Sequence, residues 1–137
     1  MHRLVCSLIQ VVAYTSEMPK LMAWADVAIT AGGTTCLESS FMGLPSVVVV
    51  TADNQARSAA DLAKRGIIVN LGAIADVESG RMAREIRALV EDPHSRSQMS
   101  EKGRKLVDGY GSSRVVDRML AFSRRNQGVL RNSAGAR

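Results

Sequence analysis

The sequence predicts an α/β domain in which a parallel β-sheet is flanked by helices. Short β-branched runs alternate with helix-like segments along the 137 residues, a length that fits one domain. Hydrophobic residues make up 46% of the chain and aromatic residues only 4%, so the core must consist mainly of aliphatic side chains. Strands that alternate with helices are typical of βαβ units, in which the strands run parallel.

The first three elements are an expected strand, helix and strand. Residues 9–14 are rich in β-branched and aromatic side chains, which is typical of a strand. Residues 18–25 are expected to form a short helix with Pro19 in its first turn, where the missing N–H removes no helical hydrogen bond. Residues 26–31 form the next expected strand. These three elements would make the first βαβ unit.

A helix and the clearest strand of the chain come next. The helix, at residues 35–42, is expected to end at Gly43, a residue that readily adopts the left-handed conformation of a C-terminal cap. The strand at residues 45–51 contains a run of consecutive valines, as is typical of a strand covered on both faces. Asp53 or Asn54 is expected to cap the following helix, which would run to residue 65.

The remaining sequence predicts one more strand and further helices. Residues 66–71 form the last expected strand. Apolar residues at helical spacing then predict helices at residues 82–90, 98–107 and 115–122. Pro93 is expected to end the first of these helices, and Gly109 and Gly111 separate the other two.

The net charge of +5 is concentrated at the end of the chain. The last fourteen residues contain four arginines and no acidic residue, whereas the rest of the chain is nearly neutral. We therefore expect a folded domain at residues 1–123 and a basic, disordered tail at residues 124–137. The alternative for the tail is contact with a membrane surface or a nucleic acid. The low aromatic content argues against a stacking platform for single-stranded nucleic acid, which is not an expected partner.

Several other protein classes are not expected. Two cysteines, Cys6 and Cys36, are too few for a disulfide framework. The apolar run at residues 4–12 is too short and too polar to span a bilayer, and the start lacks the pattern of a secretory signal. The histidines and carboxylates show no metal-ligand spacing. We expect a cytoplasmic protein with no transmembrane segment, metal or cofactor.

Loops that follow three predicted strands contain the candidate binding residues. These loops are residues 14–16, 32–35 and 51–55, and we expect them to converge on one rim because ligands of parallel sheets bind beyond the carboxyl ends of the strands. Glycines allow a ligand to approach the backbone closely, and the free N–H groups of a helix start favour an anion such as a diphosphate. The residues of this turn are Gly32, Gly33, Thr34 and Thr35. The alternative is that the glycine pair simply forms the corner between strand and helix.

Four further residues are candidates for either a structural or a functional role. Glu38 follows Thr35 at the spacing of a capping box, but its carboxylate would also suit the two vicinal hydroxyls of a ribose. The amides of Asn54 and Gln55 suit sugar hydroxyls and acetamido groups, although Asn54 is equally a candidate helix cap. Cys36 is expected to be a small packing residue, because neither histidine is placed to act as its base.

The segment at residues 18–38 resembles the C-terminal domain of two-domain, Rossmann-like nucleotide-sugar enzymes of the GT-B type. The likeness continues through Gly43-Leu44-Pro45 and Ala52-Asp53-Asn54-Gln55, and it is clear over residues 14–71. The chain is most similar to the UDP-2,4-diacetamido-trideoxy-sugar hydrolases of pseudaminic acid synthesis and the related spore-coat polysaccharide proteins. It is more distantly similar to the N-acetylglucosaminyltransferase that completes lipid II. The resemblance implies an incomplete GT-B C-terminal domain with a Rossmann-like sheet.

The resemblance also implies roles for matching residues. The turn from Gly32 to Thr35 would hold the diphosphate of UDP, and Glu38 would hold the ribose. Residues that would border the uracil are Tyr14, Thr15 and Met18. Residues that would contact the sugar are Asn54 and Gln55. No catalytic residue is assigned within this chain, because such enzymes carry the base, a histidine in the hydrolase, on a preceding domain.

The leading functional hypothesis is the UDP-sugar-binding part of a nucleotide-sugar hydrolase in surface polysaccharide or nonulosonic acid synthesis. The first alternative is the same part of an inverting UDP-sugar glycosyltransferase. The second is a non-catalytic module that pairs with a separate N-terminal subunit. The resemblance implies that the sequence is a truncated product, a split subunit or a fragment. We expect little activity from it alone, and either self-association or a partner subunit.

Overall fold

A three-stranded parallel sheet organises the molecule. The computed structural model describes residues 9–134. The strands are β1 (Ala28–Ala31), β2 (Ser46–Val50) and β3 (Ile68–Ala73), and they lie side by side in the order of the chain. Ala28 pairs with Ser46, and Ser46 pairs in turn with Ile68. The predicted α/β fold, with a parallel sheet flanked by helices, is confirmed.

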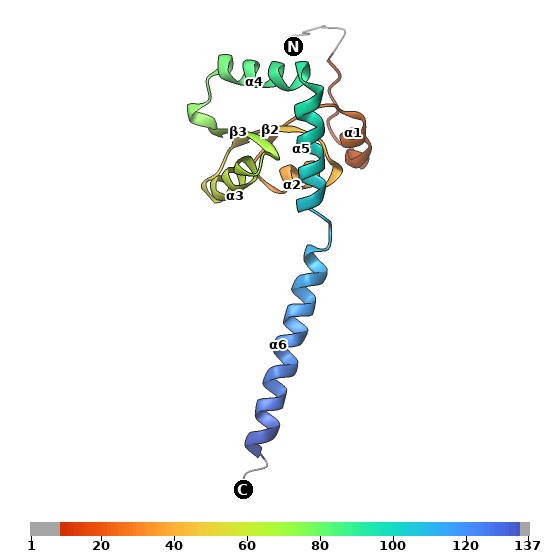
Figure 1. Ribbon diagram of the computed structural model, residues 1–137, viewed down its shortest axis with the longest axis vertical. Coiled ribbons are helices and arrows are strands. Elements are labelled where there is room, and N and C mark those ends of the chain that lie inside the picture. The colour runs from red at the N-terminus through yellow and green to blue at the C-terminus, as the bar shows by residue number, and fades with distance from the viewer. Residues whose placement is uncertain (1–8, 135–137) are drawn as a thin grey trace.

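Helices cover both faces of the sheet, as Figure 1 shows. Helix α1 (Met18–Trp24) precedes the first strand. The helices that join or follow the strands are α2 (Thr34–Met42), α3 (Asp53–Lys64), α4 (Ser79–Glu91) and α5 (Pro93–Leu106), with a short 3-10 turn η1 (Ile74–Asp76) after β3. Side chains of α2 and α3 pack on one face, and those of α4 and α5 pack on the other. The sheet is therefore the middle layer of three.

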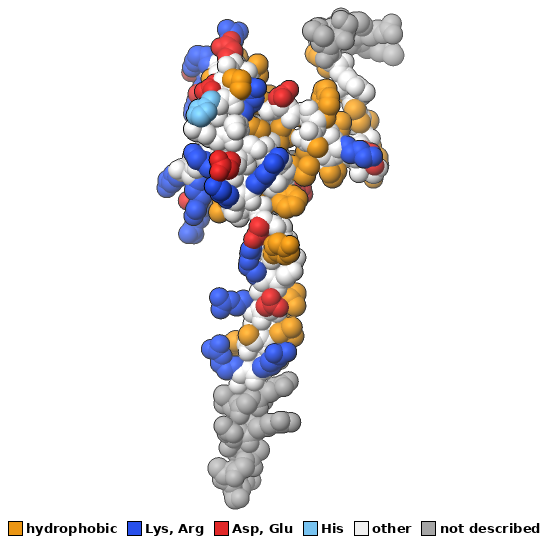
Figure 2. Space-filling view, turned by 45° about the vertical axis from the view of Figure 1, so that its right-hand side comes forward, with side chains coloured by type: hydrophobic (Ala, Val, Ile, Leu, Met, Phe, Trp, Pro, Cys, Tyr) orange, Lys and Arg blue, Asp and Glu red, His pale blue; other side chains and the backbone are white. Residues whose placement is uncertain are grey.

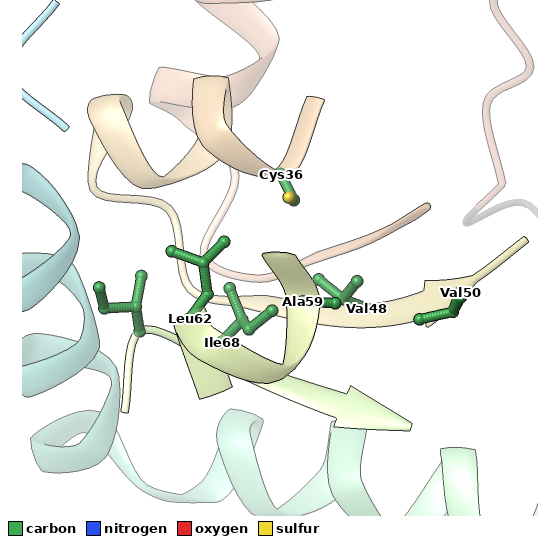
Figure 3. Packing of buried hydrophobic residues seen from close by; sticks show 7 residues of the cluster. Cys36, Val48, Val50, Ala59, Leu62 and Ile68 are labelled. Atoms are coloured by element: carbon green, nitrogen blue, oxygen red, sulfur yellow. The ribbon is translucent and has the colours of Figure 1, made fainter. Parts of the chain in front are cut away.

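The central strand β2 divides its valines between two apolar clusters. Val48 and Val50 lie in one cluster, which is drawn in Figure 3, together with Cys36 of α2 and two residues of α3. Val47 and Val49 lie in the other cluster, with Leu71 of β3, Leu89 of α4 and Met99 of α5. Successive side chains of a strand point to opposite faces, so a strand covered on both sides has consecutive apolar residues, as Val47 to Val50 are. The buried Ser46 satisfies its hydroxyl by donating a hydrogen bond to the Leu44 carbonyl. The valine run therefore forms the centre of the domain.

The last helix, α6 (Gly111–Ala134), projects away from the sheet and the other helices (Figure 1). Gly109 precedes it with a left-handed φ of 79°, which separates α6 from α5. Hydrophobic side chains are exposed along the upper part of α6 (Figure 2), and they are Val115, Val116, Met119, Leu120 and Phe122. No helix of the described range 9–134 is long and apolar enough to cross a membrane.

The strand predicted at residues 9–14 is wrong. This segment forms neither a helix nor a strand, and Ile9, Val11 and Tyr14 are exposed. Its β-branched residues favour an extended backbone, but a strand also requires a neighbouring backbone with which to pair. Within residues 9–134 the sheet ends at β1, and residues 9–14 do not pair with it.

Two predicted helix starts are also wrong. The N-terminal cap of α3 is Ala52, and neither Asp53 nor Asn54 caps the helix. Helix α5 begins at Pro93, several residues before the predicted start, because Asp92 accepts a hydrogen bond from the Ser95 N–H and caps the helix. Helix α4 therefore ends before Pro93, and Pro93 is the first residue of α5, where its missing N–H is tolerated.

The predicted ends of the other elements agree with the structure to within a few residues, except for the last helix, which was predicted to end at residue 122. Gly43 adopts the expected left-handed cap of α2, with a φ of 72°. At the C-terminus, α6 continues to Ala134, which differs from the disordered tail expected at residues 124–137. Residues 135–137 of that expected tail lie outside the described residues.

Candidate functional site

Two of the three predicted loops meet at the carboxyl ends of β1 and β2. The N–H of Gly32, directly after β1, donates a hydrogen bond of 3.0 Å to the carbonyl of Val49 in β2. Thr51 directly follows β2 and leads into α3. The parallel register therefore places the glycine turn beside the start of α3, on the rim where ligands of such sheets bind.

The glycine turn leads straight into α2. Gly33 is the N-terminal cap of this helix, with an extended backbone and no side chain that caps it. The N–H groups of Thr34 and Thr35 stand in the first turn, where no helical carbonyl lies in reach of them. Both threonines are exposed. The turn therefore presents N–H donors, hydroxyls and the positive end of a helix dipole to solvent, which is an arrangement suited to an anion.

The capping box predicted between Thr35 and Glu38 is wrong. Helix α2 begins one residue earlier than expected, so Thr35 is a helical residue and cannot act as the cap. Glu38 is exposed and makes no capping hydrogen bond. It lies four residues after Thr34, on the same side of the helix and about 6 Å further along it. The carboxylate is thus free to accept hydrogen bonds beside the glycine turn.

Glu38 stands at the edge of a groove of about 590 Å³ between α1 and α2. The groove is mainly apolar, and its other lining residues are Met18, Pro19, Met22, Leu37, Phe41, Met42, Val107 and Gly109. Met18 and Glu38, both predicted to contact the nucleotide, therefore line the same groove. Tyr14 is 89% exposed and does not line the groove. Thr15 uses its hydroxyl to accept a local hydrogen bond from the N–H of Glu17.

Gln55 lies over the glycine turn. A Cβ placed on Gly32 would come within 3.3 Å of the Gln55 Cβ, and one placed on Gly33 would come within 3.7 Å of the Gln55 Nε2. The Gln55 Oε1 accepts hydrogen bonds from the Thr51 N–H at 3.0 Å and the Thr51 hydroxyl at 3.1 Å. This side chain therefore joins the loop after β2 to the turn before α2.

Asn54 is not brought to the same place. It lines a separate groove of about 420 Å³ on α3, together with Arg57, Asp61 and Arg65. Adjacent residues of a helix point about 100° apart, so Asn54 and Gln55 cannot both face the turn. The sequence predicted a shared role for the two amides, and the structure brings only Gln55 to the rim.

A family comparison decides what kind of domain this is. The model of the glycosyltransferase family 28 C-terminal domain matches residues 2–110, which include the sheet, the glycine turn and every candidate site residue. The chain belongs to this family. The predicted GT-B-type C-terminal domain is thereby confirmed at the level of the family.

Curated relatives of this family 28 domain are named for polysaccharide biosynthesis and for the transfer of N-acetylglucosamine. The chain is 30% identical to the spore coat polysaccharide biosynthesis protein SpsG of Bacillus subtilis over 107 residues, which cover 78% of the chain and 32% of the relative. It is also 30% identical over 125 residues to the UDP-N-acetylglucosamine--N-acetylmuramyl-(pentapeptide) pyrophosphoryl-undecaprenol N-acetylglucosamine transferase of Geobacter sulfurreducens. That match covers 85% of the chain and 33% of the relative. The chain spans about a third of the length of these relatives.

These matches favour the transferase alternative over the leading hydrolase hypothesis. The family is named for glycosyltransferases, and neither of the two relatives is named as a hydrolase. The spore-coat likeness inferred from the sequence is confirmed, and so is the likeness to the lipid II transferase. The specific resemblance to the diacetamido-sugar hydrolase is not supported.

Cys36 packs inside this family 28 domain, as expected from the sequence. Its side chain is fully buried in the cluster with Val48 and Ala59, and its thiol donates to the carbonyl of Gly33. Burial raises the pKa of the Cys36 thiol, and the N–H groups of Cys36 and Leu37 only partly offset this. A thiol with a raised pKa is a poor nucleophile, so Cys36 stabilises the start of α2 by packing.

Sequence reasoning missed several residues around the site. Thr51 was given no role of its own beyond being the first residue of the loop at residues 51–55, yet its N–H and hydroxyl hold the Gln55 amide. Phe41, in the same helix as Glu38, also lines the groove, and so do Val107 and Gly109, which are distant in the chain. Gly109 approaches the Phe41 ring so closely that a Cβ there would lie 3.1 Å from it. Of these residues, only Gly109 could have been suspected from the sequence, because a glycine shortly after a helix often has a left-handed backbone.

Proposed function

We propose that this family 28 domain binds the UDP portion of a UDP-sugar for a glycosyltransferase. The single observation that carries the proposal is the start of α2. There, N–H groups and threonine hydroxyls face solvent at the carboxyl end of β1, with the exposed Glu38 about one turn away. The family match and the UDP-sugar named for one relative support the same reading.

The proposed fit follows from the chemistry of UDP. In the turn from Gly32 to Thr35, the N–H groups of Gly33, Thr34 and Thr35 and the two threonine hydroxyls donate hydrogen bonds to the diphosphate, whose charge the helix dipole also favours. The Gly32 N–H stays bonded to the Val49 carbonyl, and Gly32 contributes a close approach of the backbone. Glu38 accepts hydrogen bonds from the two ribose hydroxyls, since a carboxylate has acceptors for both. Residues proposed to border the uracil are Tyr14, Thr15 and Met18. Of the two amides proposed for the sugar side, Gln55 has the better geometric support.

The proposed contribution to catalysis is the stabilisation of the departing UDP. Transfer of the sugar breaks its bond to the diphosphate, and negative charge increases on the phosphate that leaves. Donors that are already in place for this charge lower the barrier without reorganisation. We assign no catalytic base to residues 9–134, where His94 lies in the first turn of α5 and makes a hydrogen bond with Gln98. Acceptor binding, a partner subunit and the expected cytoplasmic location belong to the same proposal.

Titration of UDP into the protein tests the site. Glu38→Ala is expected to weaken UDP binding about ten-fold, because it removes hydrogen bonds to a charged acceptor. The loss is expected to be much smaller with 2′-deoxy-UDP, which lacks one of the two hydroxyls. Glu101→Ala on the outer side of α5 is the matched control, since its carboxylate is exposed and pairs only with Lys105. Equal UDP affinity of wild type and Glu38→Ala would remove Glu38 from the site.

A further inference from the structure

The orientation of the Gln55 amide is defined by its hydrogen bonds. The backbone N–H of Thr51 can only donate, so the Gln55 atom that faces it must be the oxygen. The Thr51 hydroxyl donates to the same oxygen and occupies its second lone pair. A flipped amide would place its NH₂ group against an N–H, with two donors facing each other. Thr51 therefore holds the amide in one of its two orientations.

This orientation directs the amide nitrogen toward the glycine turn. The Nε2 lies 3.7 Å from the place that a Cβ on Gly33 would occupy, with no side chain between them. The side chain also packs closely over Gly32, where a Cβ would lie 3.3 Å from the Gln55 Cβ and 3.5 Å from the Gln55 Oε1. The two N–H bonds of Gln55 thus join the donors that α2 presents at the same turn.

We propose that Gln55 donates to the diphosphate of the bound nucleotide and that Thr51 is the residue that positions it. This inference rests on the proposed function and extends it, since the sequence assigned Gln55 to the sugar and gave Thr51 no role. Gln55 supplies a neutral donor from α3, while the turn supplies N–H donors from α2. The ligand would then be held from both sides of the junction between β1 and β2.

Binding of UDP and of uridine by the full chain tests this inference. Gln55→Glu keeps the shape of the side chain and an oxygen that can accept from Thr51, but it replaces the NH₂ donor with a negatively charged oxygen. We expect UDP affinity to fall at least ten-fold and uridine affinity, measured by NMR titration, to change less than two-fold. A purely structural role would weaken the binding of both ligands to a similar extent.

Thr51 is tested with a matched pair. Thr51→Val removes the hydroxyl and keeps the side-chain shape, so UDP affinity is expected to fall about three-fold while uridine affinity is unchanged. Thr51→Ser keeps the hydroxyl and is expected to restore UDP affinity. Thermal unfolding of each variant establishes that the fold is retained.

The possible results separate this inference from the function on which it rests. If wild type binds UDP and Glu38→Ala weakens it, but Gln55→Glu binds UDP as tightly as wild type, the role of Gln55 is overturned and the proposed function stands. If Thr51→Val and Thr51→Ser bind UDP equally, the positioning role of the Thr51 hydroxyl is overturned. If wild type binds no UDP, both the function and this inference are wrong.

Discussion

Strands β1 and β2 pair in register, yet their surroundings differ. All five residues of β2 are buried, whereas Ile29 of β1 is 55% exposed. β2 has a strand on each side and helices on both faces, and β1 is the last strand of the sheet within residues 9–134. Both strands have apolar side chains, so the difference comes from what lies beside them. An apolar strand is therefore buried only to the extent that neighbouring strands and helices cover it.

The largest expected effect comes from a charge placed in each strand. Val48→Asp would bury a carboxylate in the cluster around Cys36 and is expected to cost more than about 4 kcal/mol of unfolding free energy. Ile29→Asp, on the open strand, is expected to cost less than about 1 kcal/mol because its side chain stays in contact with water. Urea unfolding followed by circular dichroism measures both values. Similar losses for the two variants would mean that β1 is covered in solution.

A smaller effect is expected where α5 packs against α2. A Cβ on Gly103 would lie 2.8 Å from the backbone oxygen of Ser40, so Gly103→Ala must push the two helices apart. We expect a loss of roughly 1–3 kcal/mol, typical of overpacking. The matched control is Gly111→Ala at the start of α6, where a Cβ meets nothing within 4 Å. Its unfolding free energy should change by less than about 0.5 kcal/mol.

The Gly103 variant also tests whether α5 protects β2 from solvent. Met99 of the same helix covers Val47 and Val49, so displacement of α5 should make β2 more like β1. Hydrogen exchange would then quicken at the β2 amides and stay unchanged in α6. Unchanged exchange in β2 would show that α5 is not what protects this strand.

The smallest expected effect concerns the cap of α5. Hydrogen bonds from the Ser95 hydroxyl and then from the Ser95 N–H hold the pKa of Asp92 below its ordinary value of 3.8. Because the folded state lowers this pKa, the contribution to stability is present above the ordinary value and is lost as the pH falls through the folded value. Wild type should therefore melt at a higher temperature than Asp92→Ala at pH 7.

This difference in melting temperature should shrink as the pH falls below about 4. Thermal unfolding of both proteins between pH 7 and pH 2.5 measures it. Asp92 is fully exposed, so the effect should be smaller than that of Gly103→Ala. A difference that persists unchanged at the lowest pH would mean that the carboxylate charge contributes nothing.

Much of the fold could be predicted because its elements carry local signals. The valine run of β2, the left-handed Gly43 and the glycine turn are local features, and the structure places them as expected. The strand at residues 9–14 failed because pairing depends on a partner that composition does not reveal. The start of α5 failed because Asp92 and Pro93 together form a helix start that resembles a helix end.

The candidate site was predicted less completely than the fold. The sequence identified the glycine turn and Glu38, which lie on one face of α2 as expected from their spacing. It could not distinguish Asn54 from Gln55, because both are amides at the start of one helix. That distinction required the direction of each side chain and the hydrogen bonds of Thr51. The groove lined by Phe41, Val107 and Gly109 joins distant segments, which no local pattern reveals.

The order of the strands has a consequence for how the chain folds. Because β1, β2 and β3 are neighbours in the sheet in the same order as in the chain, each crossover closes only a short loop. One face of β2 is covered once α2 and α3 have packed on it. Val47 and Val49 on the other face stay uncovered until α4 and α5, which come later in the chain, have docked. Until then this apolar strand surface is open to other chains. The rate at which the last two packing helices dock therefore sets the time during which folding competes with aggregation.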